Sequence, residues 1–372
     1  MEWENNIRRA DPYVPGEQPK RTDVIKLNTN ECPYPPAPAV RQAAQQLDYD
    51  RLRLYPDTEA GELADALCAN YGIPREKLFI GVGSDDVLAM AFQTFFNSDK
   101  PILFPDVTYS FYDVWAELFK IPYTRKPLDG SFRIVKEDYM VENGGIVLPN
   151  PNAPTGILEE VGVMEEIIAA NPGSVVIIDE AYVDFGGESC RGLTEKYENL
   201  LVVQTFSKSR AMAGMRIGFA IGSPRLIGYL KDVKFAFNSY TMSLPAVWLG
   251  AASVKDTEYF HDTVNKIIQT RERVKKELTE LGFTFPDSKA NFIFAAHDRV
   301  PAKIIFEELK KRNIYVRFWD KPRIENYLRI TVGTDKQMQI LTENLREIIA
   351  AWDSRQSEQH LTENSFWTHS DV

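Results

Sequence analysis

The residues from Leu200 to Gly222, LLVVQTFSKSRAMAGMRIGFAIG, join a buried-strand pattern to a group of side chains that could do chemistry. Residues 200–203 are apolar and partly β-branched, which is typical of a strand inside a sheet. Lys208 follows. A lysine there most often reaches solvent, but one desolvated near other cations has a lowered pKa and can act as a nucleophile. Its neighbours that could bind a phosphate group are Thr205, Ser207 and Arg216.

A carboxylate and a phenol follow another apolar run, in VVIIDEAYVDF. Residues 175–178 have the pattern of a buried strand, so Asp179 would lie at a strand's carboxyl end, where α/β sheets place ligands. A buried carboxylate needs a cation or several donors, and no lysine or arginine is close in the sequence. Tyr182 could present its phenol to the same pocket. Taken alone, the motif is better explained by Asp179 capping the next turn.

Two glycine- or proline-rich turns could supply further groups. GVGSDD, at 81–86, follows an apolar strand and opens a helix, but Asp86 stands where a dinucleotide fingerprint needs its third glycine. With Ser84 as the expected N-cap, the amides of this helix N-terminus would suit one phosphate group. PNPNAPTG, which ends at Gly156, is a turn whose asparagines could offer amide donors. Each motif alone is a weak signal.

Together, these groups indicate a particular cofactor. The lysine supplies an amine that can bond to a carbonyl carbon, and the hydroxyl, amide and guanidinium donors can hold a phosphate group. The strand-end carboxylate can keep a pyridine nitrogen protonated, so that the ring serves as an electron sink. Pyridoxal phosphate requires this set of groups. The sequence therefore predicts a pyridoxal phosphate site built around Lys208 and Asp179.

The composition argues against several other classes of protein. The chain has 372 residues, a formal net charge of −10 and a pI near 5.2, which argues against nucleic acid or an anionic membrane as its main partner. No apolar run approaches the roughly 20 residues of a membrane helix, and the N-terminal residues lack a signal peptide's apolar centre. Three cysteines and four scattered histidines show no metal-ligand spacing. We expect a cytoplasmic protein without a metal.

The order of apolar and helical segments indicates two domains. Apolar runs at 77–83, 102–105, 145–150, 175–181 and 200–207 alternate with helical patterns such as 62–71 and 85–96. This predicts an α/β domain with a mostly parallel sheet between helices. A long amphipathic helix at 256–281, then strands and helices up to 352, predicts a smaller α+β domain. The expected parts are an N-terminal arm packing on the small domain (1–38), a large domain (39–250), a small domain (251–356) and a flexible tail (357–372).

The motifs, in this order, resemble those of the fold-type I pyridoxal-phosphate aminotransferases, and most closely the histidinol-phosphate aminotransferase subfamily. The likeness covers nearly all of the chain, from PYVPGEQP to LRITVGT. It implies a homodimer that transfers the amino group of L-histidinol phosphate to 2-oxoglutarate in histidine biosynthesis. The matching motifs are LNTNECP, RLYPD, VGSDD, PDVTYSFY, PNPNAPTG, IIDEAYVDF, TFSKSRAMAGMRIGFA, FNSYTMS, NFIFA and VRFWDKPRIENYLRITVGT.

The resemblance also implies a role for each matching residue. Lys208 would bond to the cofactor and carry the transferred proton, and Asp179 would pair with the pyridine nitrogen. Tyr182 would hydrogen bond to the ring's phenolic oxygen, Tyr109 would stack on the ring, and Tyr55 would reach the phosphate across the dimer interface. The other phosphate ligands would be Ser84 with the amides of Gly83 and Asp85, and Thr205, Ser207 and Arg216. The substrate would be held by Arg329 at its carboxylate or phosphate and, at its far end, by Arg317 and Tyr13.

Three departures from the family's pattern affect these expectations. Ala153 stands where the usual motif has a second asparagine, so either Asn152 takes over the contact to the phenolic oxygen or Tyr182 makes it alone. Ser209 and Arg210 replace small or aromatic residues after the lysine, and Arg210 would add a positive charge near the phosphate. FNSYTMS, near the substrate, lacks the commoner ending of its motif.

Other functions fit parts of the same pattern. An aromatic aminotransferase is the nearest alternative, because Tyr13, Tyr55 and Tyr109 could line an apolar pocket. A lyase similar to threonine-phosphate decarboxylase would use the same scaffold and release carbon dioxide without needing a 2-oxo acid. A non-catalytic regulatory protein with this fold is opposed by the intact set of Lys208, Asp179 and Arg329.

Overall fold

The computed structural model describes residues 2–21 and 23–367. Contacts divide the chain into two compact units. Unit 1 comprises residues 1–15, 31–268 and 286–291, and unit 2 comprises residues 16–30, 269–285 and 292–372. The boundary expected near 250 therefore differs from this division, which falls inside the long helix α8 (Thr257–Glu280) and inside the N-terminal arm. The amphipathic pattern of the predicted helix at 256–281 is continuous, so it does not indicate a boundary between units within that helix.

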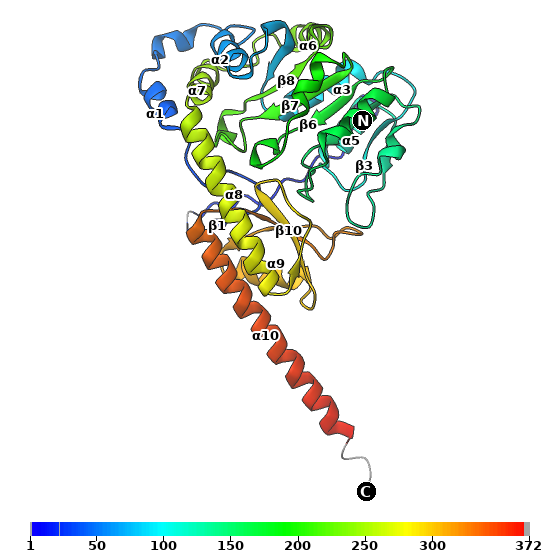
Figure 1. Cartoon of the computed structure of the whole chain (residues 1–372), viewed down its shortest axis with the longest axis vertical. Coiled ribbons are helices and arrows are strands. Elements are labelled where there is room, and N and C mark those ends of the chain that lie inside the picture. Colours follow the sequence, from blue (N-terminus) through cyan, green and yellow to red (C-terminus); the bar gives the residue numbers. More distant parts are fainter. Residues whose placement is uncertain (1, 22, 368–372) are drawn as a thin grey trace. The chain divides into compact units, whose positions relative to one another are not determined.

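A seven-stranded sheet forms the centre of unit 1 (Figure 1). Its strands are β2 (Leu78–Gly81), β3 (Ile102–Pro105), β4 (Tyr123–Lys126), β5 (Gly145–Pro149), β6 (Val176–Asp179), β7 (Leu200–Thr205) and β8 (Gly218–Gly222). They lie in the order β2-β8-β7-β6-β5-β3-β4. Strand β8 is antiparallel to both of its neighbours, and the remaining pairs are parallel. The mostly parallel sheet is as predicted. Two strands are not among those predicted: β4, which is a polar edge strand, and β8, which begins and ends with glycine.

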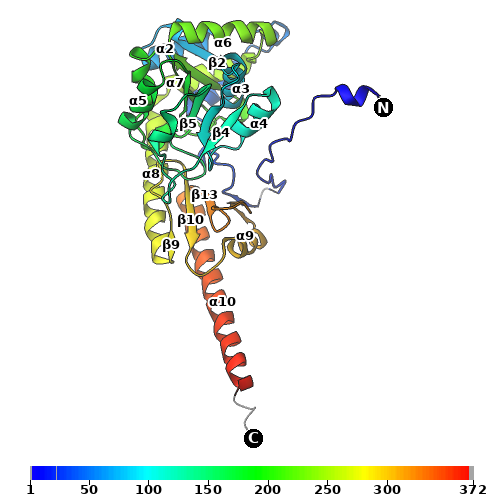
Figure 2. The ribbon, with the colours of Figure 1, turned by 90° about the vertical axis from the view of Figure 1, so that its right-hand side faces the viewer.

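Helices cover both faces of this sheet. They are α1 (Pro38–Gln45), α2 (Gly61–Tyr71), α3 (Ser84–Phe95), α4 (Phe111–Phe119), α5 (Val161–Ala170), α6 (Pro224–Phe237) and α7 (Leu244–Lys255). Because successive strand residues point to opposite faces, Ile177 and Leu201 pack with α3, α4 and α6, whereas Ile178 and Val202 pack with α5. Figure 2 shows α3 and α4 on one side and α5 on the other. Helices α1, α2 and α7 form a third cluster against β2 and β8.

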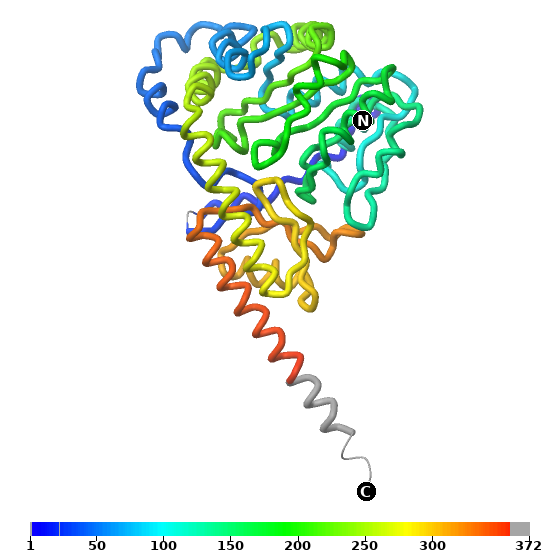
Figure 3. The backbone as a smooth tube through the Cα atoms, in the orientation of Figure 1, coloured from blue at the N-terminus to red at the C-terminus, as the bar shows by residue number. Residues whose placement is uncertain are grey.

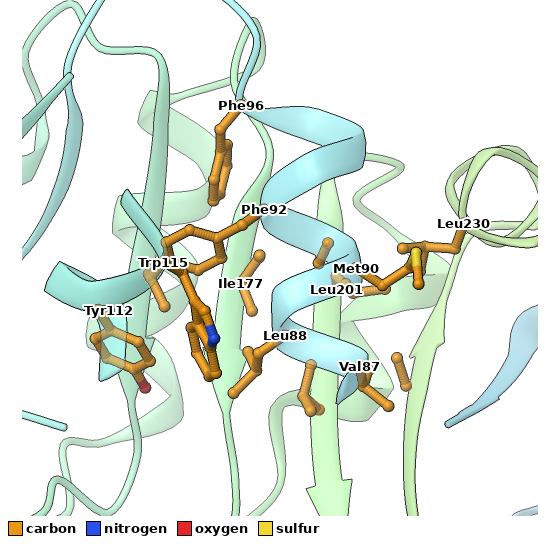
Figure 4. Packing of buried hydrophobic residues seen from close by; sticks show 14 of the residues in the cluster. Val87, Leu88, Met90, Phe92, Phe96, Tyr112, Trp115, Ile177, Leu201 and Leu230 are labelled. Carbon is orange, nitrogen blue, oxygen red and sulfur yellow. The ribbon is translucent and has the colours of Figure 1, made fainter. Parts of the chain in front are cut away.

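The core beneath α3 is rich in aromatic rings (Figure 4). The ring of Phe92 meets Trp115 at a centroid distance of 5.5 Å and Phe96 at 5.1 Å, both edge to face. Such pairs add to the stabilisation that burial of their apolar surface gives. This packing fixes α3 on the sheet and thereby fixes the loop from Gly81 to Gly83 that precedes it.

Strands β5, β6 and β7 are neighbours in the sheet and follow one another in the sequence. Figure 3 traces the backbone with colours that follow the sequence.

Unit 2 is built on small, mainly antiparallel sheets. Its elements are β1 (Ile25–Lys26), β9 (Phe283–Thr284), β10 (Phe292–His297), α9 (Ala302–Lys311), β11 (Ile314–Tyr315), β12 (Arg317–Phe318), β13 (Leu328–Thr331) and α10 (Asp335–Trp367). Four strands lie in the antiparallel order β12-β13-β10-β9, and β1 pairs with β11 in parallel. Leu328 and Ile330 face a core made with α8, α9 and α10. Their neighbour Arg329 therefore belongs to the opposite face of the sheet.

The last helix continues further than expected. The sequence pattern predicts that it ends near Trp352 and that 357–372 form a flexible tail, whereas α10 reaches Trp367. The added segment contains no glycine or proline, so nothing in its composition stops a helix. Residues 368–372 of the expected tail lie outside the described residues.

Among the described residues, no helix is both long enough and apolar enough to cross a membrane.

Candidate active site

Two neighbouring parallel strands bring predicted site residues to the same edge of the sheet of unit 1. Asp179 is the last residue of β6 and is paired in register with Val203 of β7. Thr205 ends β7, and the chain then turns through Ser207 and Lys208. The carboxylate and the lysine therefore follow the carboxyl ends of adjacent parallel strands, where α/β folds bind ligands.

Asp179 is a buried carboxylate held by two donors. The residue is only 5% exposed. The hydroxyl of Tyr112 donates to Oδ2 at 2.8 Å, and the Ala181 amide donates to Oδ1 at 3.2 Å. Burial raises the pKa of Asp179 to about 6, although these two hydrogen bonds and the charge of Lys208 act in the opposite direction. The carboxyl is thus mainly ionised at neutral pH, as a partner for a cation must be.

Lys208 lies beside Tyr182. The Lys208 ammonium nitrogen is 5.7 Å from the centroid of the Tyr182 ring. The segments that carry these two residues are tied together, because the Ser209 hydroxyl donates to Asp184 Oδ2 at 2.5 Å. The half-buried lysine therefore lies beside the phenol, on segments that follow the ends of the adjacent strands β6 and β7.

The N-terminus of α3 and Arg216 are joined by an ion pair. Arg216 Nη2 donates to Asp85 Oδ2 at 3.0 Å, and the Tyr109 hydroxyl donates to Asp85 Oδ1 at 2.8 Å. A methyl group on Gly83 would lie 2.5 Å from Arg216 Nη2, so only glycine lets the guanidinium approach this turn. Gly83 has φ +86° and is itself the N-cap. The expectation that Ser84 caps the helix is therefore wrong: Ser84 is the first helical residue, and no side chain caps the helix.

Hydroxyl groups complete this cluster beside the lysine. Thr205 and Ser207 are buried and share a hydrogen bond between their Oγ atoms at 3.1 Å. The Ser207 amide also donates to Thr205 Oγ1 at 3.1 Å. A methyl group on Gly218 would lie 2.2 Å from the Ser84 amide nitrogen. The start of β8 therefore touches the N-terminus of α3, which brings the two halves of the predicted phosphate site together.

The contacts of Asn152 bear on whether Asn152 or Tyr182 would donate to the phenolic oxygen of pyridoxal phosphate. Its Nδ2 donates to Val107 O and to Thr155 Oγ1, both at 3.0 Å. Its Oδ1 accepts from the Thr108 hydroxyl at 3.1 Å. Both amide hydrogens are thus used within the protein, and Ala153 offers no polar side chain. These contacts favour Tyr182 as the donor to a phenolic oxygen.

Arg210, two residues after Lys208, has buried contacts that its place in the sequence does not indicate. Its Nη1 donates to Ser253 O at 3.0 Å, and its guanidinium lies over the rings of Phe260 (4.3 Å) and Phe206 (5.3 Å). The residue is buried. These contacts anchor the chain just after Lys208, and the expected charge near a phosphate group is not needed to explain the residue.

Aromatic rings line the side of the site formed by Tyr109. Tyr13 stacks on Phe111 at a centroid distance of 4.3 Å and lies 6.4 Å from Tyr109. Phe111 in turn stacks on Trp115 at 5.0 Å. The N-terminal arm thus places Tyr13 next to Tyr109, as a shared pocket requires.

Tyr55 has a different environment. Its side chain is 81% exposed and stacks on Tyr240 at a centroid distance of 4.5 Å. Among the described residues, the nearby segments also expose several large apolar side chains. These are Tyr49, Leu52, Leu54, Phe235 and Phe237.

Unit 2 holds the two remaining predicted residues. Arg317 of β12 and Arg329 of β13 are direct cross-strand partners. Each guanidinium carbon lies 5.2 Å from the centroid of the Trp319 ring. Arg329 also donates from Nη2 to Asn28 O at 3.0 Å and lies over Phe292 at 5.4 Å. Two permanent positive charges are therefore held side by side in this unit.

The residues of unit 1 fit the groups of pyridoxal phosphate. The cluster of Arg216, the α3 amides and the buried hydroxyls can take a phosphate group, and the glycine at 83 leaves space where a Cβ would collide with the guanidinium. A buried carboxylate is available for a pyridine nitrogen, and an amine is available for an aldehyde.

Comparison with known families gives the assignment. The family model for class I and II aminotransferases matches residues 22–345. The chain belongs to this family. It is a transferase of amino groups, and its cofactor is pyridoxal phosphate, as in the rest of the family.

The aminotransferase has well-matched relatives. A histidinol-phosphate aminotransferase of Lactococcus lactis subsp. cremoris (strain MG1363) is 50% identical over 349 residues, which are 94% of this chain and 98% of the relative. One of Brachyspira hyodysenteriae is 49% identical over 346 residues, covering 93% and 98% of the two chains. The solved structure of histidinol-phosphate aminotransferase from Sinorhizobium meliloti in complex with pyridoxal-5'-phosphate has a TM-score of 0.81 at 22% identity, covering 88% and 91%. That likeness confirms the predicted fold.

Three residues of the aminotransferase that contact residues named above had no predicted role. Tyr112 binds Asp179, Asp184 binds Ser209 and Trp319 lies against both arginines of unit 2. One signal was available, since Tyr112 is three residues after Tyr109, and residues so spaced share a helix face. Asp184 and Trp319 lie within the matching motifs IIDEAYVDF and VRFWDKPRIENYLRITVGT, but the spacing of the residues does not indicate which side chains they contact.

Proposed function

We propose that the aminotransferase converts L-histidinol phosphate and 2-oxoglutarate into imidazole acetol phosphate and L-glutamate, a step of histidine biosynthesis. The observation that carries this proposal is the adjacent pair Arg317 and Arg329. Two planar guanidinium groups side by side suit a phosphate ester, which carries nearly two negative charges at neutral pH. The names of the relatives, which are about 50% identical, support the same substrate.

In this proposal the residues of unit 1 bind the cofactor and move one proton. When bound, pyridoxal phosphate withdraws electrons from the substrate carbon that bears the amino group. Lys208 Nζ takes the proton from that carbon, and the Asp179 carboxylate holds the pyridine nitrogen in its protonated form. Tyr182 donates to the phenolic oxygen, and Tyr109 lies against the ring. The phosphate ligands are the backbone amides of Gly83 and Asp85, together with Ser84, Thr205, Ser207 and Arg216.

We infer that the active form is a homodimer, in which Tyr55 reaches the cofactor phosphate of the other copy. The exposed Tyr55–Tyr240 stack and the apolar side chains near it support this inference, because contiguous exposed apolar surface usually marks an interface. We also infer a cytoplasmic location, which is consistent with free thiols at Cys32, Cys68 and Cys190.

A comparison of three amino substrates tests the proposed reaction. The kcat/KM for histidinol phosphate, L-phenylalanine and O-phospho-L-threonine is measured with 2-oxoglutarate as acceptor, in wild type and in Arg317→Ala. We expect histidinol phosphate to be preferred. We also expect Arg317→Ala to lower its kcat/KM by roughly tenfold or more, since a charge-assisted hydrogen bond contributes about 1.5–3 kcal/mol.

The same measurement separates the alternatives. A preference for phenylalanine, with equal losses for both substrates in Arg317→Ala, would indicate an aromatic aminotransferase; the ring cluster of Tyr13, Tyr109 and Phe111 is the feature that would favour it. Release of carbon dioxide from O-phospho-L-threonine without consumption of 2-oxoglutarate would indicate a lyase. Either result would contradict the proposed reaction.

A further inference from the structure

The cross-strand arginine pair of unit 2 poses an electrostatic problem. Arg317 and Arg329 are register partners in antiparallel strands, and like charges placed directly opposite each other destabilise a strand pair. Neither guanidinium can lose its charge at physiological pH. The arrangement therefore needs groups that hold the two charges together before any ligand arrives.

Trp319 is the group that meets both charges. It is the first residue after β12, two positions after Arg317. Its ring centroid is 5.2 Å from the guanidinium carbon of Arg317 and 5.2 Å from that of Arg329. Both distances are within the range at which the negative face of an indole attracts a cation. One aromatic ring thus serves two cations.

Arg329 has supports besides the indole. Its Nη2 donates to Asn28 O at 3.0 Å, and its guanidinium lies over the ring of Phe292 at 5.4 Å. Arg329 should therefore keep its place when the indole is removed. The ring contact that the two arginines share would be lost, so the pair would be uncoupled.

We propose that Trp319 is a specificity-determining positioning residue, whose ring holds Arg317 and Arg329 together as a site for a phosphate monoester in preference to a single carboxylate. This inference rests on the proposed function. A phosphate monoester carries about −1.5 to −2 charges and three acceptor oxygens, enough to engage two guanidinium forks. A carboxylate has one charge and is satisfied by one fork.

Substitution of Trp319 provides the test. Trp319→Leu removes the ring, and Trp319→Phe keeps a smaller ring as the conservative variant. Trp352→Leu is the matched control, since Trp352 is also half-buried in unit 2 but packs against its apolar core. Each holoenzyme is assayed for KM and kcat with histidinol phosphate, and for competitive inhibition by inorganic phosphate and by acetate. Circular dichroism checks the fold of each variant.

We expect Trp319→Leu to raise the KM for histidinol phosphate and the inhibition constant of inorganic phosphate by about tenfold, with kcat changed less than about threefold. Acetate inhibition should be unchanged, Trp319→Phe should give an intermediate effect, and Trp352→Leu should leave the phosphate and acetate constants in their wild-type ratio. An unchanged KM and phosphate constant in folded Trp319→Leu would overturn the inference; if that variant does not fold, a wild-type phosphate constant in Trp319→Phe would do so.

Failure of the proposed function can be distinguished from failure of the inference about Trp319. If the wild type does not turn over histidinol phosphate at all, the proposed function fails, and inhibition by inorganic phosphate against any accepted amino donor then decides the inference alone. Equal loss of phosphate and acetate inhibition in Trp319→Leu would contradict the inference about Trp319, because the ring would then support the binding of any anion.

Discussion

The hydroxyl of Tyr112 donates a 2.8 Å hydrogen bond to Asp179 Oδ2, in the interior of unit 1. Burial and the adjacent carboxylate raise the pKa of Tyr112 far above its ordinary value, so the phenol stays a donor across the working pH range. This bond favours the ionised form of Asp179 against the effect of burial. The proposed partner of the pyridine nitrogen therefore depends on Tyr112, the last residue of the motif PDVTYSFY, for which the resemblance implied no role.

Tyr112→Phe should leave Asp179 buried but without its side-chain donor. The pKa of Asp179 should then rise, because a hydrogen bond that favours the charged form has been removed. We expect the pH at which cofactor affinity falls by half to move upward by about one pH unit. The measurement is fluorescence titration of the apoenzyme with pyridoxal phosphate at several pH values. An unchanged pH dependence would show that Tyr112 only fills space.

Asp179→Asn tests the carboxylate itself. Asp179 has a raised pKa of about 6, so it takes up a proton as the pH falls through 6 and loses the charge that holds a pyridinium. Wild-type affinity for pyridoxal phosphate should therefore decrease between pH 7 and pH 5. The asparagine variant should bind more weakly at pH 7 and show a smaller further decrease. Parallel curves for the two proteins would assign the pH dependence to the cofactor's own phosphate.

The pKa shift of Asp179 also affects stability. Its pKa is higher in the folded state than the usual 3.8, so the folded protein binds the proton more tightly than the unfolded chain does. The carboxyl therefore lowers stability as the pH rises through 6. Relative to wild type, the apo form of Asp179→Asn should gain stability at pH 8 and little at pH 4. Urea unfolding at the two pH values measures this difference.

Lys208→Ala should abolish the base and the covalent link to the cofactor without unfolding the protein, because the lysine is only half-buried. Loss of the base alone should lower kcat by roughly 10²–10⁴-fold, and loss of the link adds to this. Steady-state turnover with 2-oxoglutarate measures the effect, and partial recovery with added methylamine would support the role of an amine. Substantial turnover without added amine would mean that Lys208 is not the base.

Tyr55 is expected to act in the other subunit's site. Mixing Tyr55→Phe with Lys208→Ala should form hybrid dimers in which both changes fall in one site and the second site is intact. Activity should rise above that of either parent. Subunit exchange is verified by mass spectrometry, and exchange without recovery of activity would place Tyr55 outside the neighbour's site.

The sequence predicted those parts of the structure that short-range pattern determines. Strands β6 and β7 are continuous apolar runs, so Asp179 and the turn to Lys208 could be placed at their ends. Strand β8 and the contact between Gly218 and the α3 N-terminus depend on pairing across distant segments, which a local pattern does not contain. The same reason explains why the contact of Arg210 with Ser253, 43 positions away, was not foreseen.

The predicted N-cap shows a second kind of error. Serine is a favoured N-cap, and Ser84 opens the helix, but the turn requires φ +86° at the preceding residue, Gly83. That glycine leaves the first amides without a side-chain cap. An uncapped helix N-terminus beside a guanidinium is a suitable place for a phosphate group, so local propensity failed at a position that the proposed function uses.

The most direct test of the proposed function is a single half-reaction. The cofactor-loaded enzyme is mixed with an excess of histidinol phosphate in the absence of any 2-oxo acid, and the organic products are quantified. The proposal predicts one equivalent of imidazole acetol phosphate per chain, no carbon dioxide, and further product only after 2-oxoglutarate is added. No product, or continued turnover without 2-oxoglutarate, would contradict it.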